Sequence, residues 1–285
     1  MYKLNMSIGW VSLTVSNLER SIDFYTNILG IKEKEGLLKG PDDIPLLILY
    51  EQKNAKPKPY NTRGLYHYAL LLPNRRELAR LFVRITHKWE LEGASDHLVS
   101  EAIYLKDPDG HGIEIYADRS SKGWRMATLP LNIESLLSEL KEEGTEKSLS
   151  KEWEIPKGTK IGHIHLHVSS LEKAEKFYHE ILGLDVTMRE YPGALFFSSG
   201  GYHHHIGVNV WAGINAPPPS REHVQLRSFS IILPNLDLLD NLTVKLKEKG
   251  IKVMEGLINP IKGYVGITVQ DLSLIHISEP TRQAE

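Results

Sequence analysis

The chain of 285 residues has no cysteine. Disulfide bonds, iron–sulfur clusters and thiol catalysis are therefore excluded together, and any metal chemistry has to use nitrogen and oxygen ligands. An excess of one charge is also lacking, because 34 basic and 36 acidic residues leave a net charge of -2. Nucleic-acid binding depends on neutralising phosphates, so we expect no nucleic-acid partner.

Long apolar runs are missing as well. The sequence has no stretch of about 18 apolar residues and does not begin with a basic segment followed by an apolar one. We therefore expect no membrane span, no secretory signal and a cytoplasmic protein. The length is sufficient for two domains of ordinary size, each with its own core.

What the sequence does contain is an ungapped repeat. Residues 9–19, GWVSLTVSNLE, correspond to residues 162–172, GHIHLHVSSLE, and both segments lead to Phe-Tyr and then to Ile-Leu-Gly. The copies differ at their second position, which is Trp10 in the first and His163 in the second. A shared scaffold thus carries a side chain that can bind metal at only one of two equivalent places.

Each copy predicts a strand followed by a helix. Apolar side chains alternate with others along the strand, so one face is expected in the core. The S-x-x-E pattern at Ser16 and Ser169 is typical of a helix N-terminus. Gly30 and Gly183 follow the helical pattern, where a left-handed residue commonly ends a helix.

A second repeat follows the first in each half of the chain. Residues 65–74, LYHYALLLPN, correspond to residues 226–235, LRSFSIILPN, with His67 in one copy and Ser228 in the other. Further on, Asp-Pro-Asp-Gly at 107–110 separates two alternating runs. Proline presets one dihedral angle and glycine accepts a positive φ, so a β-turn is predicted there. Glu114 is then expected on the strand that leaves this hairpin.

These repeats predict an α+β protein of four tandem βαβββ modules in two domains, with mixed, cupped sheets and the helices outside. We expect modules one and two in residues 1–125 and modules three and four in residues 159–271. Residues 126–158 are interpreted as a linker with one short helix over 133–143.

The end of the chain departs from the repeat. After ITVQD at 267–271 the repeat predicts a Pro-x-Gly turn and a closing strand, but the chain continues LSLIHISEP. Residues 272–285 are therefore expected to be a foreign or aberrant tail that replaces the native last strand, which puts the closure of module four in question.

Together these motifs resemble the vicinal oxygen chelate superfamily, and within it the two-domain extradiol enzymes of the catechol 2,3-dioxygenase type. The resemblance runs to about Asp271 and rests on FYxxILG, on GLYHYA at 64–69, on YLKDPDG at 104–110 and on GYHHHIG at 201–207. It implies Fe(II) held by two histidines and one carboxylate, with open positions for a small aromatic diol and dioxygen. Because proteins of this superfamily often assemble through sheet edges, we also expect a homo-oligomer.

The resemblance places the metal ligands on the first strands of two partner modules and on the last strand of one. Here modules two and three together supply them, as His67, Glu114 and His163. We hypothesise that module two pairs with module three and module one with module four, so that one cup holds metal and the other is vestigial. Pairing within each domain is the alternative, and it leaves His67 and Glu114 to be completed by His97 or His111.

The resemblance also implies two further site residues, and two aromatic residues are added as a ring-binding wall. Tyr104 matches a tyrosine that hydrogen-bonds the substrate or the oxygen, and His97 lies near the place of a family histidine. Tyr202 and Trp211 are expected to form an aromatic wall for a planar ring.

A run of three histidines supplies the expected acid–base residue. By strand alternation, His203 and His205 share one face and His204 lies on the other. The resemblance favours His205, whose imidazole titrates in the range needed to take a catechol proton. Exposed polar surface is the alternative interpretation of this run.

Three functions follow as hypotheses. The first is Fe(II)-dependent extradiol cleavage of a catechol-type ring with dioxygen. The second is a glyoxalase-like isomerase or thiol transferase, in which Mn(II), Ni(II) or Zn(II) acts as a Lewis acid and His205 is an added ligand. The third is a metal-free, aromatic-binding resistance protein. The presence and identity of a metal would discriminate among them.

Overall fold

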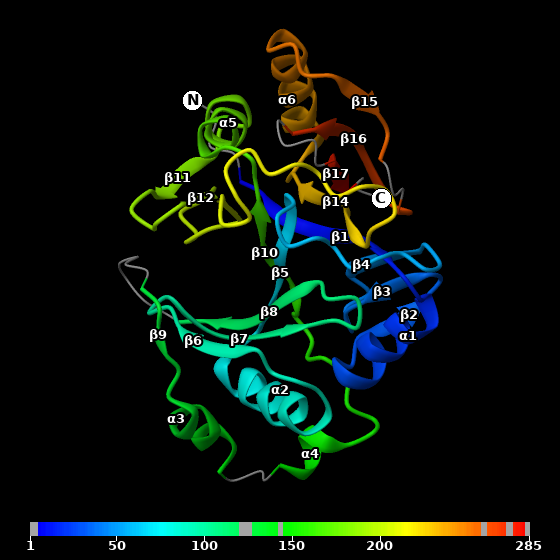
Figure 1. Ribbon diagram of the computed structural model, residues 1–285, viewed down its shortest axis with the longest axis vertical. Helices are drawn as coiled ribbons and strands as arrows, with labels where there is room; N and C mark the ends of the chain where they lie inside the picture. Colours follow the sequence, from blue (N-terminus) through cyan, green and yellow to red (C-terminus); the bar gives the residue numbers. More distant parts are fainter. Residues whose placement is uncertain (1–4, 120–126, 142–144, 258–260, 272–275, 283–285) are drawn as a thin grey trace.

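The computed structural model describes residues 5–119, 127–141, 145–257, 261–271 and 276–282. Its strands form two mixed sheets, and the helices lie outside them (Figure 1). The predicted α+β class is confirmed. The predicted domain boundary at 125/126 lies outside the described residues. Within the described ranges, no helix is both long and apolar enough to cross a bilayer.

The elements follow the predicted modules in order. Module one contains β1 (Ser7–Val15), α1 (Leu18–Asp23), the π-helical turn η1 (Phe24–Ile28), β2 (Lys32–Lys34), β3 (Leu37–Lys39) and β4 (Pro45–Glu51). Module two contains β5 (Gly64–Leu72), α2 (Arg75–Lys88), β6 (Gly93–Asp96), β7 (Ser100–Lys106) and β8 (Gly112–Asp118). The segment between the domains contains β9 (Leu129–Pro130), α3 (Ile133–Leu137), the 3₁₀ turn η2 (Ser138–Leu140) and α4 (Glu146–Leu149).

The second half repeats this pattern. Module three contains β10 (Lys160–His167), α5 (Leu171–Glu175), the π-helical turn η3 (Lys176–Ile181), β11 (Asp185–Met188), β12 (Ala194–Ser198) and β13 (Ile206–Asn209). Module four contains β14 (Gln225–Ile232), α6 (Leu236–Glu248), β15 (Val253–Glu255), β16 (Tyr264–Gln270) and β17 (His276–Arg282).

Each sheet is built from one module of each half. β10 runs antiparallel to β5 in the sheet β11-β12-β13-β10-β5-β8-β7-β6-β9, and β1 runs antiparallel to β14 in the sheet β15-β16-β17-β14-β1-β4-β3-β2. β5 and β10 lie side by side in the middle of Figure 1. The hypothesis that module two pairs with three, and one with four, is therefore confirmed, and pairing within each domain is excluded.

The last strand corrects an expectation. β17 pairs in parallel with β14 and antiparallel with β16, so the backbone of module four is closed. Ladder hydrogen bonds join backbone groups, and a sequence that departs from the repeat can still form them. The foreign origin of 272–285 stays a prediction, and its residues 272–275 and 283–285 lie outside the described part.

The helix starts are one residue later than predicted. The side chains of Asn17 and Ser170, and not those of Ser16 and Ser169, accept the capping hydrogen bond, from the backbone N–H three residues on. The predicted ends are confirmed: Gly30 and Gly183 have φ of 70° and 88°.

Two buried tyrosine–aspartate pairs connect the modules of each half. The hydroxyl of Tyr25, after α1, donates to Asp107 in the module-two turn at 2.8 Å. Tyr178 donates to Asp271 in module four at the same distance. The repeated Phe-Tyr motif thus links consecutive modules, while the sheets link modules from opposite halves.

The segment between the domains is packed against the first half. The predicted helix is divided into α3 and η2, and 142–144 lie outside the described residues. The Arg84 guanidinium of α2 is buried and donates at 2.6–2.9 Å to four carbonyls, those of Asn27, Ile28, Ser148 and Ser150. Trp153 covers Gly30, where a Cβ would lie 2.6 Å from the indole ring.

We expect Tyr25→Phe to lower the free energy of unfolding by about 1.5–3 kcal/mol, because Asp107 loses a buried hydrogen-bond donor. Urea denaturation followed by circular dichroism measures this. Tyr60→Phe is the matched control, since Tyr60 is 86% exposed. Equal midpoints for the two variants would contradict the structural role of the pair.

Candidate metal centre

Three predicted ligands meet on one face of the nine-stranded sheet. Nε2 of His67 and Nε2 of His163 lie 3.0 and 3.1 Å from the same oxygen, Oε2 of Glu114. The three ligand atoms lie within 4.8 Å of one another, and all three residues are buried. The predicted residues are therefore together, and their role as ligands stays a prediction.

The strand register explains this convergence. His163 of β10 lies opposite Ala69 of β5, and Ala69 lies opposite Glu114 of β8. Residues that lie opposite each other on adjacent strands point to the same face of the sheet, and so do residues two apart on one strand. His67, two residues before Ala69, is therefore on this face as well. Ala69 is the small residue of this row and leaves the space above it to the histidine and the carboxylate. Tyr104 of β7, opposite Glu114, extends the row.

The protonation states suit metal binding. Burial alone would raise the pKa of Glu114, but the charge and hydrogen bond of His163, together with the nearby His67, outweigh burial and hold that pKa well below its usual value. Burial lowers the pKa of His163. An ionised carboxylate and neutral imidazoles are the forms that ligate metals.

Unpartnered nitrogen atoms at the same place are further support for a metal site. Nε2 of His67 and Nδ1 of His163 are buried without a hydrogen-bond partner among the described residues. Nε2 of His67 is close to Glu114 but lacks hydrogen-bond geometry toward it. A buried donor or acceptor without a partner is costly, and a cation shared with Glu114 would remove this cost at His67. Two imidazoles and a carboxylate fit a divalent transition metal.

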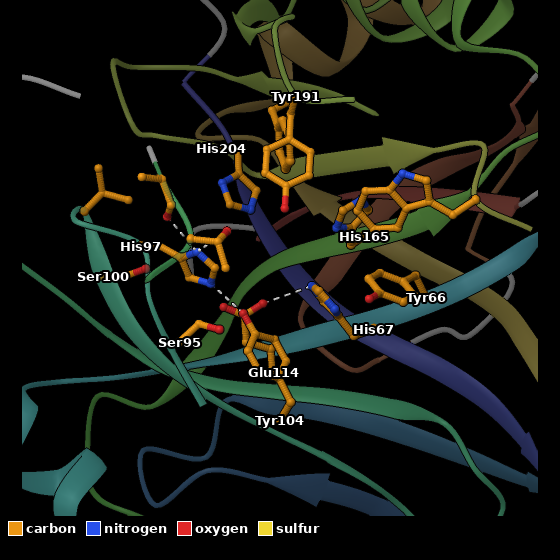
Figure 2. Close-up of a pocket in the computed structure, with 15 residues that line it drawn as sticks. Tyr66, His67, Ser95, His97, Ser100, Tyr104, Glu114, His165, Tyr191 and His204 are labelled. Carbon is orange, nitrogen blue, oxygen red and sulfur yellow. Dashed lines mark hydrogen bonds and ion pairs between the residues drawn. The ribbon is translucent and has the colours of Figure 1, made fainter. Parts of the chain in front are cut away.

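A cavity of about 240 Å³ opens beside these residues (Figure 2). Its lining includes the polar groups of His67, Glu114 and Tyr104. It also includes the aromatic rings of Tyr66, Tyr191, Phe196 and Trp211. A planar ring can therefore pack against aromatic side chains while its polar substituents face the proposed ligands.

Tyr104 and His97 are hydrogen-bonded to each other in this cavity. The Tyr104 hydroxyl and Nε2 of His97 are 2.6 Å apart, and Nδ1 of His97 lies 3.2 Å from the carbonyl of Ala127. Because a carbonyl only accepts, Nδ1 carries the proton and Nε2 accepts from Tyr104. Burial and the charge of Glu114 raise the pKa of Tyr104 well above its usual value, so this hydroxyl stays protonated.

The structure places His205, the expected acid–base residue, outside the cavity. Its Nδ1 lies 2.9 Å from Oγ of Ser198, and it does not line the cavity. His204 lines the cavity instead, with its ring 4.2 Å from that of His163. Strand alternation does not apply to this run, because β13 begins only at Ile206.

A chain of hydrogen bonds sets the tautomer of His204. Nε2 of His203 lies 3.0 Å from a carboxylate oxygen of Asp118, and the Nδ1 atoms of His203 and His204 are 2.8 Å apart. A carboxylate oxygen accepts, so a neutral His203 donates through Nε2 and accepts through Nδ1. His204 then donates through Nδ1, which leaves its Nε2 without a proton.

Of the two predicted aromatic residues, only Trp211 lines the cavity. Tyr202 is directed elsewhere, because its hydroxyl donates to Asp118 at 3.0 Å and bonds to Tyr116 at 2.7 Å. The loop that carries Tyr202 does not follow strand alternation, so no sequence pattern indicates the direction of this side chain. The structure therefore places Tyr202 outside the lining of this cavity.

Several cavity residues were not predicted as site residues, among them Tyr66, Tyr191, Phe196, His165 and His204. His165 shares a face with His163, and alternation along β10 placed it near the site. Asn209 fixes it, since the Asn209 amide lies 3.0 Å from Nε2 of His165. Tyr66 packs edge-on against Trp211, and no sequence pattern indicates this.

The equivalent place in the eight-stranded sheet is filled. Trp10 stands at the position of His163, is 1% exposed and packs against Ile48 and Ile261. Its ring lies 5.3 Å from that of Tyr264, edge to face. This sheet therefore uses the position for packing.

Comparison with known families agrees with this architecture. A family model of the Glyoxalase/Bleomycin resistance protein/Dioxygenase superfamily matches residues 7–115 and 160–272. The chain belongs to this superfamily. A relative within it, a catechol-2,3-dioxygenase of Bacillus subtilis (strain 168), is 42% identical over 264 residues, which cover 87% of this chain and 90% of the relative.

Two solved structures share the fold. A putative dioxygenase from Bacillus subtilis matches with a TM-score of 0.66 at 12% identity and covers 99% of this chain and 87% of its own. Glyoxalase I from Zea mays matches with a TM-score of 0.57 at 14% identity, covering 97% and 92%. At such identities these likenesses concern the fold alone.

Removing the carboxylate tests the centre. We expect Zn(II) to raise the melting temperature of the wild-type protein, because a ligand at 100 times its Kd stabilises the folded state by about 2.7 kcal/mol. Glu114→Gln should abolish most of this shift, and Glu19→Gln, on the exposed start of α1, should retain it. Differential scanning calorimetry with and without metal provides the measurement, and a full shift in Glu114→Gln would rule out this carboxylate as a ligand.

Proposed function

We propose that the protein is an extradiol ring-cleaving dioxygenase that acts on a catechol-type substrate, with Fe(II) held by His67, Glu114 and His163. The observation that carries the proposal is the meeting of two buried imidazoles with one buried carboxylate beside an aromatic cavity. The name of the 42% identical relative, catechol-2,3-dioxygenase, supports it.

The ligand set suits this chemistry. Two histidines and one carboxylate on one face are typical of non-haem iron sites that keep adjacent positions open. When bound, Fe(II) would supply the redox chemistry by which a diol reacts with dioxygen. Everything else in the site, from ring packing to proton handling, has to come from the chain.

The chain orients the substrate. The ring of a catechol would pack against Tyr191, Phe196 and Trp211, which direct its two hydroxyls toward Glu114 and Tyr104. Tyr104 is held by His97 and stays protonated, so it can hydrogen-bond a substrate oxygen.

His204 would act as the base. Its Nε2 carries no proton in the tautomer set by His203 and Asp118, and its ring lines the cavity. It can therefore accept a proton from a catechol hydroxyl. This assigns to His204 the role that sequence reasoning gave to His205.

The Lewis-acid alternative loses its specific support. In its predicted form it required His205 as an added metal ligand, and His205 is hydrogen-bonded to Ser198 outside the cavity.

A ring-cleavage assay distinguishes the proposed reaction from the metal-free binding alternative. Catechol in air, added to protein reconstituted anaerobically with Fe(II), should give the coloured ring-cleavage product. A folded, iron-loaded protein that yields no product would refute the proposed reaction.

We expect His204→Gln to lower kcat by about 10²–10⁴-fold, the usual contribution of a general base. Its iron content should stay at the wild-type level, since His204 is not among the proposed ligands. The neighbouring His205→Gln is the matched control and should stay near wild-type activity, because His205 lies outside the cavity. If His205→Gln were the inactive variant, the assignment of the base would be reversed.

A further inference from the structure

A second cavity, of about 660 Å³, adjoins the first. The two cavities share Tyr66, His67 and Tyr104 in their linings. The ring of Tyr66 lies 5.0 Å from that of His67 and 4.9 Å from that of His167, which lines the second cavity. The second cavity therefore lies next to the place proposed for the aromatic ring, beside His67.

Some charged side chains of this second cavity have an oppositely charged partner among the described residues, and Lys58 does not. Glu92 is paired with Lys106 at 2.6 Å, and Asp109 with Arg20 at 2.6 Å. Lys58 also lines the cavity, but its Nζ donates to a neutral acceptor, the carbonyl of Thr62, at 2.9 Å. Among the described residues, no carboxylate lies within ion-pair distance of Lys58.

Lys58 is held in place by its surroundings. Pro57 and Pro59 flank it, and proline fixes its own φ and restricts the residue before it. Its Cε packs over Gly64, where a Cβ would lie 3.4 Å away. Burial lowers the pKa of Lys58 to about 8, as expected for an ammonium group that lacks a counter-charge.

We propose that the second cavity binds an anionic substituent of the ring substrate, with Lys58 as its cationic partner. The inference rests on the proposed ring cleavage and narrows its substrate class to catechols that carry a carboxylate on a short side chain. Lys58 completes an ion pair with this carboxylate, and the diol remains at His67 and Glu114. A neutral side chain of the same length leaves Lys58 uncompensated and binds less tightly.

The test compares acid and amide forms of catechols with zero to three methylenes between ring and carboxyl group. Their equilibrium binding to the purified protein of measured metal content is followed by calorimetry without oxygen, in wild type, in Lys58→Met and in the control Lys53→Met. Lys53 has an 81% exposed side chain. Steady-state turnover of the same compounds is measured in air with iron-loaded protein.

At one chain length, we expect wild type and Lys53→Met to bind the acid about 10-fold or more tightly than the amide, the size of a charged hydrogen bond. Lys58→Met should lose this preference and still bind the amide and unsubstituted catechol as the wild type does. Equal binding of acid and amide at every length, or a preference that survives Lys58→Met, would overturn the inference. An acid preference in binding without turnover of any catechol would instead refute the proposed reaction and leave the anion site standing.

Discussion

The antiparallel pairing of β5 with β10 is the interaction on which the site depends. It joins strands from opposite halves of the chain and sets His163, Ala69 and Glu114 in one row across three strands. A shift of one residue in this pairing would turn the side chains of β10 to the other face of the sheet and separate His163 from the other two proposed ligands. This register requires glycine at position 162, since a Cβ there would lie 1.9 Å from the hydroxyl oxygen of Tyr116.

Much of this could be predicted from the sequence, because the informative residues lie in regular elements. The repeats predicted the modules, and alternation along one strand placed His163, His165 and His167 on the same face. The choice of His67, Glu114 and His163 as ligands came from the resemblance to the vicinal oxygen chelate superfamily. Their occurrence only in modules two and three then predicted that modules pair across the halves.

The errors arose where regular structure stops. His203, His204 and His205 precede β13, so their directions are set by hydrogen bonds to Asp118 and Ser198 that no local pattern encodes. The same holds for Tyr202 in that loop. β17 was not predicted for a different reason. It pairs with the edges of β14 and β16 through backbone groups, and this pairing does not require the sequence of the repeat.

The division of the ligands between the halves has a consequence for biosynthesis. Translation releases His67 and Glu114 well before His163, so the nascent first half carries an incomplete donor set. The complete set of proposed ligands forms only when β10 has emerged and paired with β5. More than a third of the chain is still to be made at the point where His163 is added, and products that end before β10 would lack one of the three proposed ligands.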